Sequence, residues 1–262
     1  MVNNKRMKNL KERIKNGEAL NGCWLNLAST ISAEIVGRTG FDWVLIDLEH
    51  GAGNEVIMYQ QLQVLEGTTA FPVVRTNEIS RPKAQNILDA GAGGIMFPRI
   101  ESAEEAQAAL RMMYYPPKGV RGLAKMVRAT GFGKHLDEYM AGLENYLVGV
   151  IQIETLNAVK QIDAIAALKE TDVLFVGPSD LSLALGIFNQ FDHADYRQAI
   201  TQVVKSAQKH GKAAGILLQN VNDYEMYYQL GFRFMACGAD TSFVARGAES
   251  MVKQMNEKKV KS

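Results

Sequence analysis

Short apolar runs recur along the chain, and each is followed by a stretch with helical periodicity. Near-continuous apolar runs of about four to eight residues are typical of parallel strands buried on both faces. Several of the stretches between them begin with Ser, Thr, Asn or Asp and end with Gly, as capped helices do. The pattern predicts eight strands, at residues 22–27, 42–47, 71–75, 93–98, 147–153, 172–177, 213–218 and 232–238.

The repeated alternation of strand and helix predicts an α/β protein built as a closed (β/α)8 barrel, the TIM barrel. An open doubly wound sheet would usually carry a Gly-rich phosphate turn after its first strand, and "NLASTIS" at 26–32 has none. The chain of 262 residues is close to the length of about 250 that such a barrel takes as a single domain. Because no flexible linker interrupts the sequence, we expect one barrel domain over residues 1–262.

Two segments depart from the strand–helix repeat. The first residues predict an additional N-terminal amphipathic helix, with Met7, Leu10 and Ile14 on its apolar face. Residues 114–146 separate the fourth predicted helix from the fifth strand and contain several Pro and Gly residues. A loop-rich excursion of this length is uncommon without a function, so we expect it to form a lid or a subunit contact.

Composition and charge narrow the classes of function. The formal net charge is +1, with acidic and basic residues interspersed, which argues against a nucleic-acid-binding face. No apolar stretch approaches the ~18–20 residues that span a bilayer, and the N-terminus lacks the apolar core of a signal peptide. The two cysteines, Cys23 and Cys237, lie in apolar runs, as buried thiols in a reducing compartment do. We therefore expect a soluble cytoplasmic protein that binds neither nucleic acid nor membrane.

Polar side chains gather where the predicted strands end. In a barrel of this type, function collects at the C-terminal ends of the strands. The opposite ends of the predicted strands are mostly glycine and apolar lead-in. The residues at the C-terminal ends, in strand order, are Trp24 and Asn26, then Asp47, Glu49 and His50, then Arg75, Pro98 and Arg99, Gln152 and Glu154, Ser179 and Asp180, Leu217 and Gln219, and Asp240.

Glu154 and Asp180 follow the fifth and sixth predicted strands, and are the candidate metal ligands. Two carboxylates that converge near a barrel axis need a counter-cation, because like charges at short range cannot both stay ionised. Oxygen-only ligands suit a hard divalent cation such as Mg²⁺. The alternative is that both acids only stabilise helix starts, Asp180 as an N-cap and Glu154 in the cap region of the next helix.

His50 and Arg75 are the other candidates for chemistry. His50 is either a general base or a loop histidine whose ring is satisfied by the backbone. Arg75 ends an apolar run, where a buried guanidinium needs an anionic partner. It either forms a structural salt bridge with Asp47 or Glu49 or holds a carboxylate or developing oxyanion of a substrate. None of the eight strand ends carries a lysine, which argues against a Schiff-base mechanism.

At this point a set of motifs resembles the HpcH/HpaI aldolase family, metal-dependent class II aldolases that act on pyruvate-derived substrates. The resemblance extends over about residues 20 to 250, nearly the whole chain, and the motifs occur in the family's order. They are "GFDWVLIDLEHG" (40–51), "FPVVR" (71–75), "YYPPKGVRG" (114–122), "QIET" (152–155), "VGPSDLS" (176–182) and "GADTS" (238–242).

The resemblance implies a role for each matching residue. His50 would be the catalytic base, Arg75 the transition-state stabiliser, and Glu154 and Asp180 the metal ligands. Gln152, Ser179 through its backbone, and Asp180 would contact the substrate, and Ser179 stands where some relatives have Ala. The family pattern also assigns to Asp89 the raising of the basicity of the histidine. Asp89 lies near the end of the third predicted barrel helix, which points to the opposite rim, so it would have to act in a neighbouring subunit's site. The family tends to form hexamers.

The function that the resemblance implies is reversible cleavage of a 4-hydroxy-2-oxo acid to pyruvate and an aldehyde. The substrate would be a 2-keto-3-deoxy sugar acid or a 4-hydroxy-2-oxo-dicarboxylate, the cofactor Mg²⁺ or alternatively Mn²⁺ or Co²⁺, and the assembly a homo-oligomer, a hexamer or trimer. A malyl- or citramalyl-CoA lyase of the same superfamily would reuse the metal site but needs a basic groove, and the sequence has no clustered Arg/Lys pocket. A barrel that binds 2-oxo acids without turnover is a third alternative.

Overall fold

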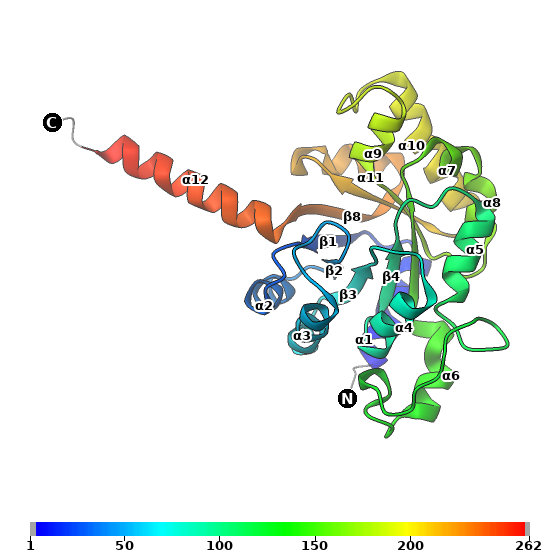
Figure 1. Ribbon diagram of the computed structural model, residues 1–262. Helices are drawn as coiled ribbons and strands as arrows, with labels where there is room; N and C mark the ends of the chain where they lie inside the picture. The colour runs from blue at the N-terminus through cyan, green and yellow to red at the C-terminus, as the bar shows by residue number, and fades with distance from the viewer. Residues whose placement is uncertain (1–3, 260–262) are drawn as a thin grey trace.

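Eight parallel strands close into a barrel in the computed structural model, which describes residues 4–259 (Figure 1). The strands pair in sequence order, and the last one returns to pair with the first. They are β1 (Leu20–Leu25), β2 (Trp43–Asp47), β3 (Phe71–Arg75), β4 (Gly94–Phe97), β5 (Val148–Ile153), β6 (Val173–Val176), β7 (Ala213–Leu218) and β8 (Phe232–Ala239). The predicted (β/α)8 barrel is confirmed, and each predicted strand overlaps an observed one with bounds that differ by at most two residues.

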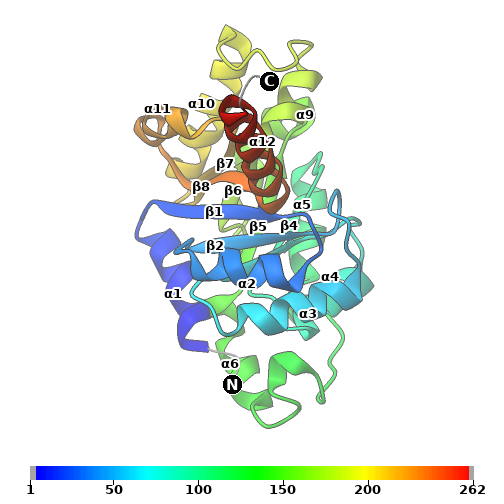
Figure 2. The same cartoon turned by 90° about the vertical axis from the view of Figure 1, so that its left-hand side faces the viewer.

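Helices follow the strands around the outside of the barrel (Figures 1 and 2). Four of these helices begin at a Ser, Asn or Thr N-cap whose side chain accepts a backbone N–H of the first turn, namely Ser29, Asn54, Ser102 and Thr155. The helices that line the outside are α2 (Thr30–Arg38), α3 (Glu55–Leu65), α4 (Arg81–Asp89), α5 (Ala103–Arg111), α7 (Leu156–Lys160), α8 (Ile162–Ala167), α9 (Pro178–Ala184), α10 (Ala194–Lys209) and α11 (Tyr224–Leu230), the last preceded by the 3₁₀ turn η2 (Val221–Asp223).

Aromatic rings from four strands fill the interior of the barrel. The indole of Trp43 stacks on the ring of Phe234 with centroids 4.0 Å apart, and Trp24 lies 5.4 Å from Phe175. These side chains are almost completely buried, and the Trp43 Nε1–H donates to the carbonyl of Leu20 at 3.3 Å. The dense packing gives the rim above it a rigid base.

The predicted N-terminal helix is α1 (Asn4–Lys15), which packs on the barrel at the N-terminal ends of the strands. Leu10 and Ile14 are buried as expected, whereas the side chain of Met7 lies outside the described residues. The buried Lys11 Nζ donates to the carbonyl of Leu147 at 2.6 Å and to Asp172 Oδ2 at 2.9 Å. Leu147 and Asp172 immediately precede β5 and β6, so α1 is anchored opposite the rim where the candidate residues lie.

The excursion at 114–146 contains a 3₁₀ turn, η1 (Arg128–Thr130), and a further helix, α6 (Leu136–Tyr146). Helix α6 lies beside α1 in both views of the molecule (Figures 1 and 2). Helix α6 therefore lies at the N-terminal end of the barrel, away from the rim, so the helical part of this segment does not form the lid that was one of the two expectations. The other expectation, a subunit contact, stays a prediction.

The last helix, α12 (Asp240–Lys258), points away from the barrel (Figures 1 and 2). Helix α12 follows β8 with no residue between them, whereas four residues connect β1 to α2. The buried carboxylate of Asp240 accepts the backbone N–H of Asn26 at 2.7 Å and of Leu27 at 3.2 Å, which fixes the start of the helix against the β1–α2 loop. The helix consequently leaves the barrel instead of folding back over β8 and β1.

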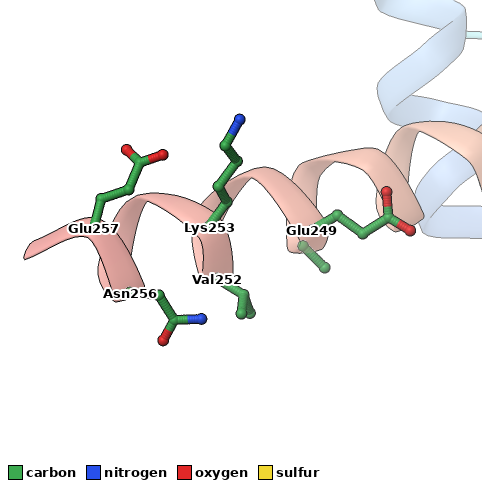
Figure 3. Close-up of a pocket in the computed structure, with 6 residues that line it drawn as sticks. Glu249, Val252, Lys253, Asn256 and Glu257 are labelled. Carbon is green, nitrogen blue, oxygen red and sulfur yellow. The ribbon is translucent and has the colours of Figure 1, made fainter. Parts of the chain in front are cut away.

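Side chains along α12 are exposed almost throughout. Figure 3 shows its final turns, where a hollow of about 780 Å³ is lined only by residues of the helix itself, among them Glu249, Val252 and Lys253. It is the surface of an uncovered helix and not an enclosed site. Its exposed apolar residues are Phe243, Val244, Met251, Val252 and Met255. Even so, no helix between residues 4 and 259 combines the length and apolarity needed to cross a membrane.

Candidate active site

Asp47 and Arg75 form the centre of the rim. They are the last residues of β2 and β3 and are paired in the register of the two strands. Arg75 Nε donates to Asp47 Oδ1 at 2.9 Å and Nη2 donates to Oδ2 at 2.7 Å, a bidentate pair in which both side chains are at least nine-tenths buried. Asn26 Nδ2 also donates to Asp47 Oδ2, at 2.8 Å. The structural salt bridge considered for Arg75 therefore exists.

Glu49 and His50 lie in the turn that follows β2. The backbone N–H groups of both residues donate to Asp47 Oδ1, at 3.0 and 3.3 Å, so the same carboxylate that holds Arg75 also shapes this turn. Glu49 Oε2 lies 3.0 Å from Arg75 Nη1 and 3.9 Å from His50 Nε2. The His50 side chain is 70% exposed, so it faces solvent at the rim and is not a histidine satisfied inside the loop.

The charges in this cluster determine the pKa values of the two paired groups. Burial alone would raise the pKa of the Asp47 carboxyl, but the Arg75 guanidinium and two backbone N–H groups lower it below its ordinary value. Burial would likewise lower the pKa of Arg75, and its hydrogen bonds with Asp47 raise it. Both groups are therefore ionised near neutral pH, and Arg75 is held at the rim as a guanidinium cation paired with carboxylates.

Glu154 follows β5 and is 3% exposed. Its Oε1 accepts the backbone N–H of Arg99 at 2.8 Å, and its Oε2 accepts the side-chain amide of Gln152. Burial raises the pKa of the Glu154 carboxyl to about 7, against an ordinary 4.5, and the carboxylates of Asp180 and Glu49 add to the rise. Arg75 acts in the opposite direction. Asp180, Glu49 and Arg75 are therefore all near enough to Glu154 at the rim to change its pKa.

Asp180 and Ser179 lie in the first turn of α9, directly after β6, and both are exposed. Gly177 connects the strand to the helix at a point where its backbone lies against the Glu154 side chain. A methyl group at Gly177 would overlap Glu154 Oε2 and come within 2.9 Å of Gln152 Nε2. Glycine at 177 therefore lets the start of α9, and with it Asp180, come close to Glu154 without displacing the carboxylate.

The donors at this rim suit a hard divalent cation. Glu154 and Asp180 offer oxygen ligands. The negative charge of Asp180 raises the pKa of the buried Glu154, so a cation bound between the two carboxylates would offset their repulsion. Gln152 Oε1 is buried and has no hydrogen-bond partner among the described residues. The described residues contain no cluster of three or more His, Cys, Asp and Glu side chains placed to hold a metal. A cation held by the two carboxylates would therefore keep coordination positions for water and substrate oxygens.

Comparison with known proteins identifies the family. The family model for HpcH/HpaI aldolase/citrate lyase matches residues 20–247, nearly the whole chain. The chain belongs to this family. The resemblance that the sequence motifs carried is thereby confirmed.

Individual members of the HpcH/HpaI family match over almost their full lengths. A hydroxypyruvate/pyruvate aldolase of Paraburkholderia phytofirmans is 36% identical, with 94% of this chain and 96% of that protein aligned. A 4-hydroxy-2-oxo-heptane-1,7-dioate aldolase of Klebsiella pneumoniae is 35% identical, with 92% and 91% aligned. The crystal structure of a family protein from Burkholderia cenocepacia superposes with a TM-score of 0.90 at 32% identity, covering 95% of this chain and 99% of that one.

Asp89, to which the HpcH/HpaI pattern assigns the raising of the basicity of the histidine, lies away from the candidate active site of its own chain. It is the last residue of α4, a helix that runs back from the rim, so within one chain it lies at the opposite end of the barrel from His50. Its Oδ1 accepts a hydrogen bond from Nη2 of the fully buried Arg121 at 2.6 Å, and Arg121 also donates to the hydroxyl of Tyr139. A role at the candidate active site therefore requires a second copy of the chain, and that role stays a prediction.

Two contributors to the site were missed in the sequence. Gly177 was not considered, although a glycine between a strand and an acidic helix start is a signal for close backbone approach. The other is the backbone of Arg99, which has a positive φ of 52° and points its N–H at Glu154. Nothing in the sequence indicates that contact, because it depends on the conformation of the peptide and not on the side chain.

Proposed function

We propose that this protein is a divalent-metal-dependent aldolase that reversibly cleaves a 4-hydroxy-2-oxo acid to pyruvate and an aldehyde. Membership of the HpcH/HpaI family makes the chain a carbon–carbon lyase, and its aldolase relatives support a pyruvate aldolase. The observation that carries the proposal is the buried Arg75, held ionised by Asp47 and Glu49 beside the Glu154 carboxylate. That arrangement suits an anionic substrate that becomes more negative at one oxygen during the reaction.

Glu154 and Asp180 would hold the metal, with Mg²⁺ proposed as the ion and Mn²⁺ or Co²⁺ as alternatives that oxygen ligands discriminate weakly. A divalent cation bound there supplies positive charge that polarises the 2-oxo group and offsets the charge of the developing enolate. Glu154 must be ionised to bind it. Because burial raises the pKa of Glu154 to about 7, metal binding should weaken as the pH falls below that value.

Arg75 would stabilise the negative charge that develops as the carbon–carbon bond breaks. Its contacts to Asp47 and Glu49 use Nε, Nη1 and Nη2, and since each Nη carries two protons, one N–H remains on each for substrate oxygens. The ion pairs fix the guanidinium before the substrate binds, so no reorganisation is needed during the reaction.

His50 would remove the proton from the C4 hydroxyl, directly or through a water molecule. Its exposed position at the rim, 3.9 Å from Glu49 Oε2, leaves the imidazole free to meet a substrate that enters from solvent. Gln152 and the backbone of Ser179 would contact the 2-oxo acid, together with Asp180. Asp89 would act on the histidine of a neighbouring copy.

A coupled assay tests the proposal. Pyruvate release from a panel of 4-hydroxy-2-oxo acids is followed with lactate dehydrogenase, before and after exhaustive chelation and after Mg²⁺ is restored. We expect release to stop on chelation and to return with Mg²⁺, and full activity in the metal-free protein would refute the proposal. His50→Ala should lower kcat far more than it weakens Mg²⁺ binding, whereas His193→Ala, at the exposed start of α10, should change neither.

We further propose that the protein works as a cytoplasmic homo-oligomer, a hexamer or trimer, assembled through α12. The exposed apolar side chains of α12, and the exposed Ile31 and Ile35 on α2 beside its start, offer surface that a second copy would cover. Light scattering after size exclusion should show Val252→Glu shifted to smaller species, with Lys205→Glu on α10 unchanged. A wild-type monomer at micromolar concentration would contradict the proposal.

A further inference from the structure

A second polar cavity lies at the end of the barrel opposite the candidate active site. It has a volume of about 280 Å³ and is bounded by α1, by the end of α6 and by the segments that lead into β6 and β7. Helices α1 and α6, which lie side by side (Figure 1), both contribute lining residues. Its lining consists of Lys11, Ile14, Lys15, Tyr114, Lys118, Glu144, Asn145, Lys169, Glu170, Thr171, Asp172, Gly211 and Lys212.

The charges in this basic cavity do not balance. Five lysines and three carboxylates line it, which leaves an excess of two positive charges, although the chain as a whole carries only +1. Two of the lysines are neutralised within the cavity. Lys11 Nζ lies 2.9 Å from Asp172 Oδ2, and Lys118 Nζ lies 2.8 Å from Glu144 Oε2 and 3.6 Å from Glu170 Oε1. The three carboxylates are therefore engaged by these two cations.

Among the described residues, none of the remaining three lysines donates a hydrogen bond to a carboxylate, and their one ion pair is the long contact of Lys169 with Glu144. Lys212 Nζ donates only to the carbonyls of Leu168 and Lys169, at 2.9 and 3.2 Å, so one of its three protons has no acceptor there. Lys169 Nζ reaches Glu144 only at 3.9 Å, and Lys15 forms no ion pair with the described residues. Burial lowers the pKa of Lys212, Lys11 and Lys15 act in the same direction, and the carboxylates of Asp172 and Glu170 oppose the shift only in part. An anion bound between these lysines would therefore be attracted by all three and would reduce their mutual repulsion.

We propose that the basic cavity binds a compact dianion of the phosphate class, as inorganic phosphate or a phosphomonoester. The excess of two positive charges matches a dianion. The volume accommodates a phosphate group with several waters, each of which occupies about 30 Å³, but not a dinucleotide. All of the cations are lysines, which bind phosphate as point charges, and no arginine lines the cavity to offer the fork that suits a planar carboxylate.

An anion in this place would connect elements that are far apart in the sequence. It would bridge the end of α1 to the segment before β6 and to Lys212 before β7. Since a ligand that binds only the folded chain stabilises it, phosphate should raise the melting temperature by anchoring α1 to the barrel. This inference is independent of the proposed aldolase activity, because the cavity lies at the other end of the strands.

Isothermal titration calorimetry of the full chain tests the proposal, at constant ionic strength and with EDTA present. The titrants are inorganic phosphate, glycerol phosphate and malonate, with chloride as the ionic-strength control. Lys15→Gln removes an exposed charge that has no ion-pair partner, and it should weaken phosphate binding about tenfold. Lys212→Gln should do the same, and Lys205→Gln on the outer face of α10 should bind phosphate as the wild type does.

The outcomes separate the basic cavity from the candidate active site. Phosphate binding that Lys15→Gln weakens, together with a rise in melting temperature that Lys15→Gln reduces, supports the proposal. Whichever of phosphate and glycerol phosphate binds more tightly identifies the source of the anion. Phosphate binding that is unchanged by Lys15→Gln, or that is lost in Arg75→Gln instead, would overturn it. Malonate binding as tight as that of phosphate would overturn the choice of a phosphate-class ligand.

Discussion

Glu154→Gln should make the metal-free protein more stable at alkaline pH, although it removes a proposed metal ligand. In the folded chain the pKa of Glu154 is raised to about 7, whereas in the unfolded chain it returns to about its ordinary 4.5. The folded state therefore binds the proton more tightly than the unfolded state. The contribution of this group to stability is fully present below pH 4.5 and is lost as the pH rises through 7.

The magnitude follows from the two pKa values. One pKa unit corresponds to about 1.4 kcal/mol. The difference between the folded and unfolded pKa of Glu154 therefore lowers the free energy of unfolding by about 3 kcal/mol once Glu154 is ionised in the folded protein. A glutamine carries no charge and avoids that cost. It can also keep both hydrogen bonds, because Gln152 can turn its amide so that the buried, unpartnered Oε1 accepts from the new side chain.

Urea unfolding in EDTA at several pH values between 5 and 8.5 measures the effect. We expect the advantage of Glu154→Gln over the wild type to grow with pH by about 2 to 3 kcal/mol. The control is Glu104→Gln, an exposed carboxylate on α5, whose difference from the wild type should not depend on pH. Added Mg²⁺ should stabilise the wild type and not Glu154→Gln. A stability difference between variant and wild type that is constant across the pH range would show that burial does not destabilise the ionised carboxylate. A variant that is less stable than the wild type at pH 8 would show the same.

Three further substitutions test the positioning of the rim and the core beneath it. Asp47→Ala removes the bidentate partner of Arg75 and leaves a buried guanidinium with one partner. It should lower the free energy of unfolding in urea by about 3 to 5 kcal/mol and cause a large loss of kcat. Stability within about 1 kcal/mol of the wild type would contradict this. Gly177→Ala forces the Glu154 carboxylate to move and should weaken Mg²⁺ binding about tenfold in calorimetry, with the fold preserved by circular dichroism; unchanged affinity would argue that the cation binds elsewhere. Trp43→Phe shortens a fully buried side chain and should cost about 2 kcal/mol of stability with little effect on KM, as chemical denaturation and steady-state kinetics would show.

The barrel could be predicted because its strands are buried on both faces. Each of the eight strands therefore forms a nearly continuous apolar run, and the polar residue after each run marks the rim. Asp47 and Arg75 illustrate this, since their positions at the ends of successive strands made an ion pair one of the two alternatives for Arg75, and the register of β2 and β3 produces it. The sequence left open whether Asp47 or Glu49 would hold the guanidinium, and both do.

The direction of α12 could not be predicted. Helical periodicity shows which side chains share an apolar face, but not whether that face covers the helix's own barrel or a different molecule. Asp240 lies at the rim, as its position after β8 predicted. Its burial and its bonds to the backbone of Asn26 and Leu27 could not be predicted, because they depend on how α12 leaves the barrel. Gly177 signals a close backbone approach, but the sequence does not show that Glu154 and Gln152 are the side chains it approaches.

If the protein assembles through α12 as proposed, the contact of Asp240 with the β1–α2 loop would connect assembly with catalysis. Asp240 holds the backbone of Asn26, whose side chain donates to Asp47, which in turn holds Arg75. If α12 is the assembly helix, its first residue is three hydrogen-bonded steps from the guanidinium proposed to stabilise the transition state. Specific activity should then fall on dilution below the dissociation constant of the oligomer, and crowding or a crosslink within the assembly should preserve it. Rates measured at nanomolar enzyme would consequently underestimate the activity of the assembled protein.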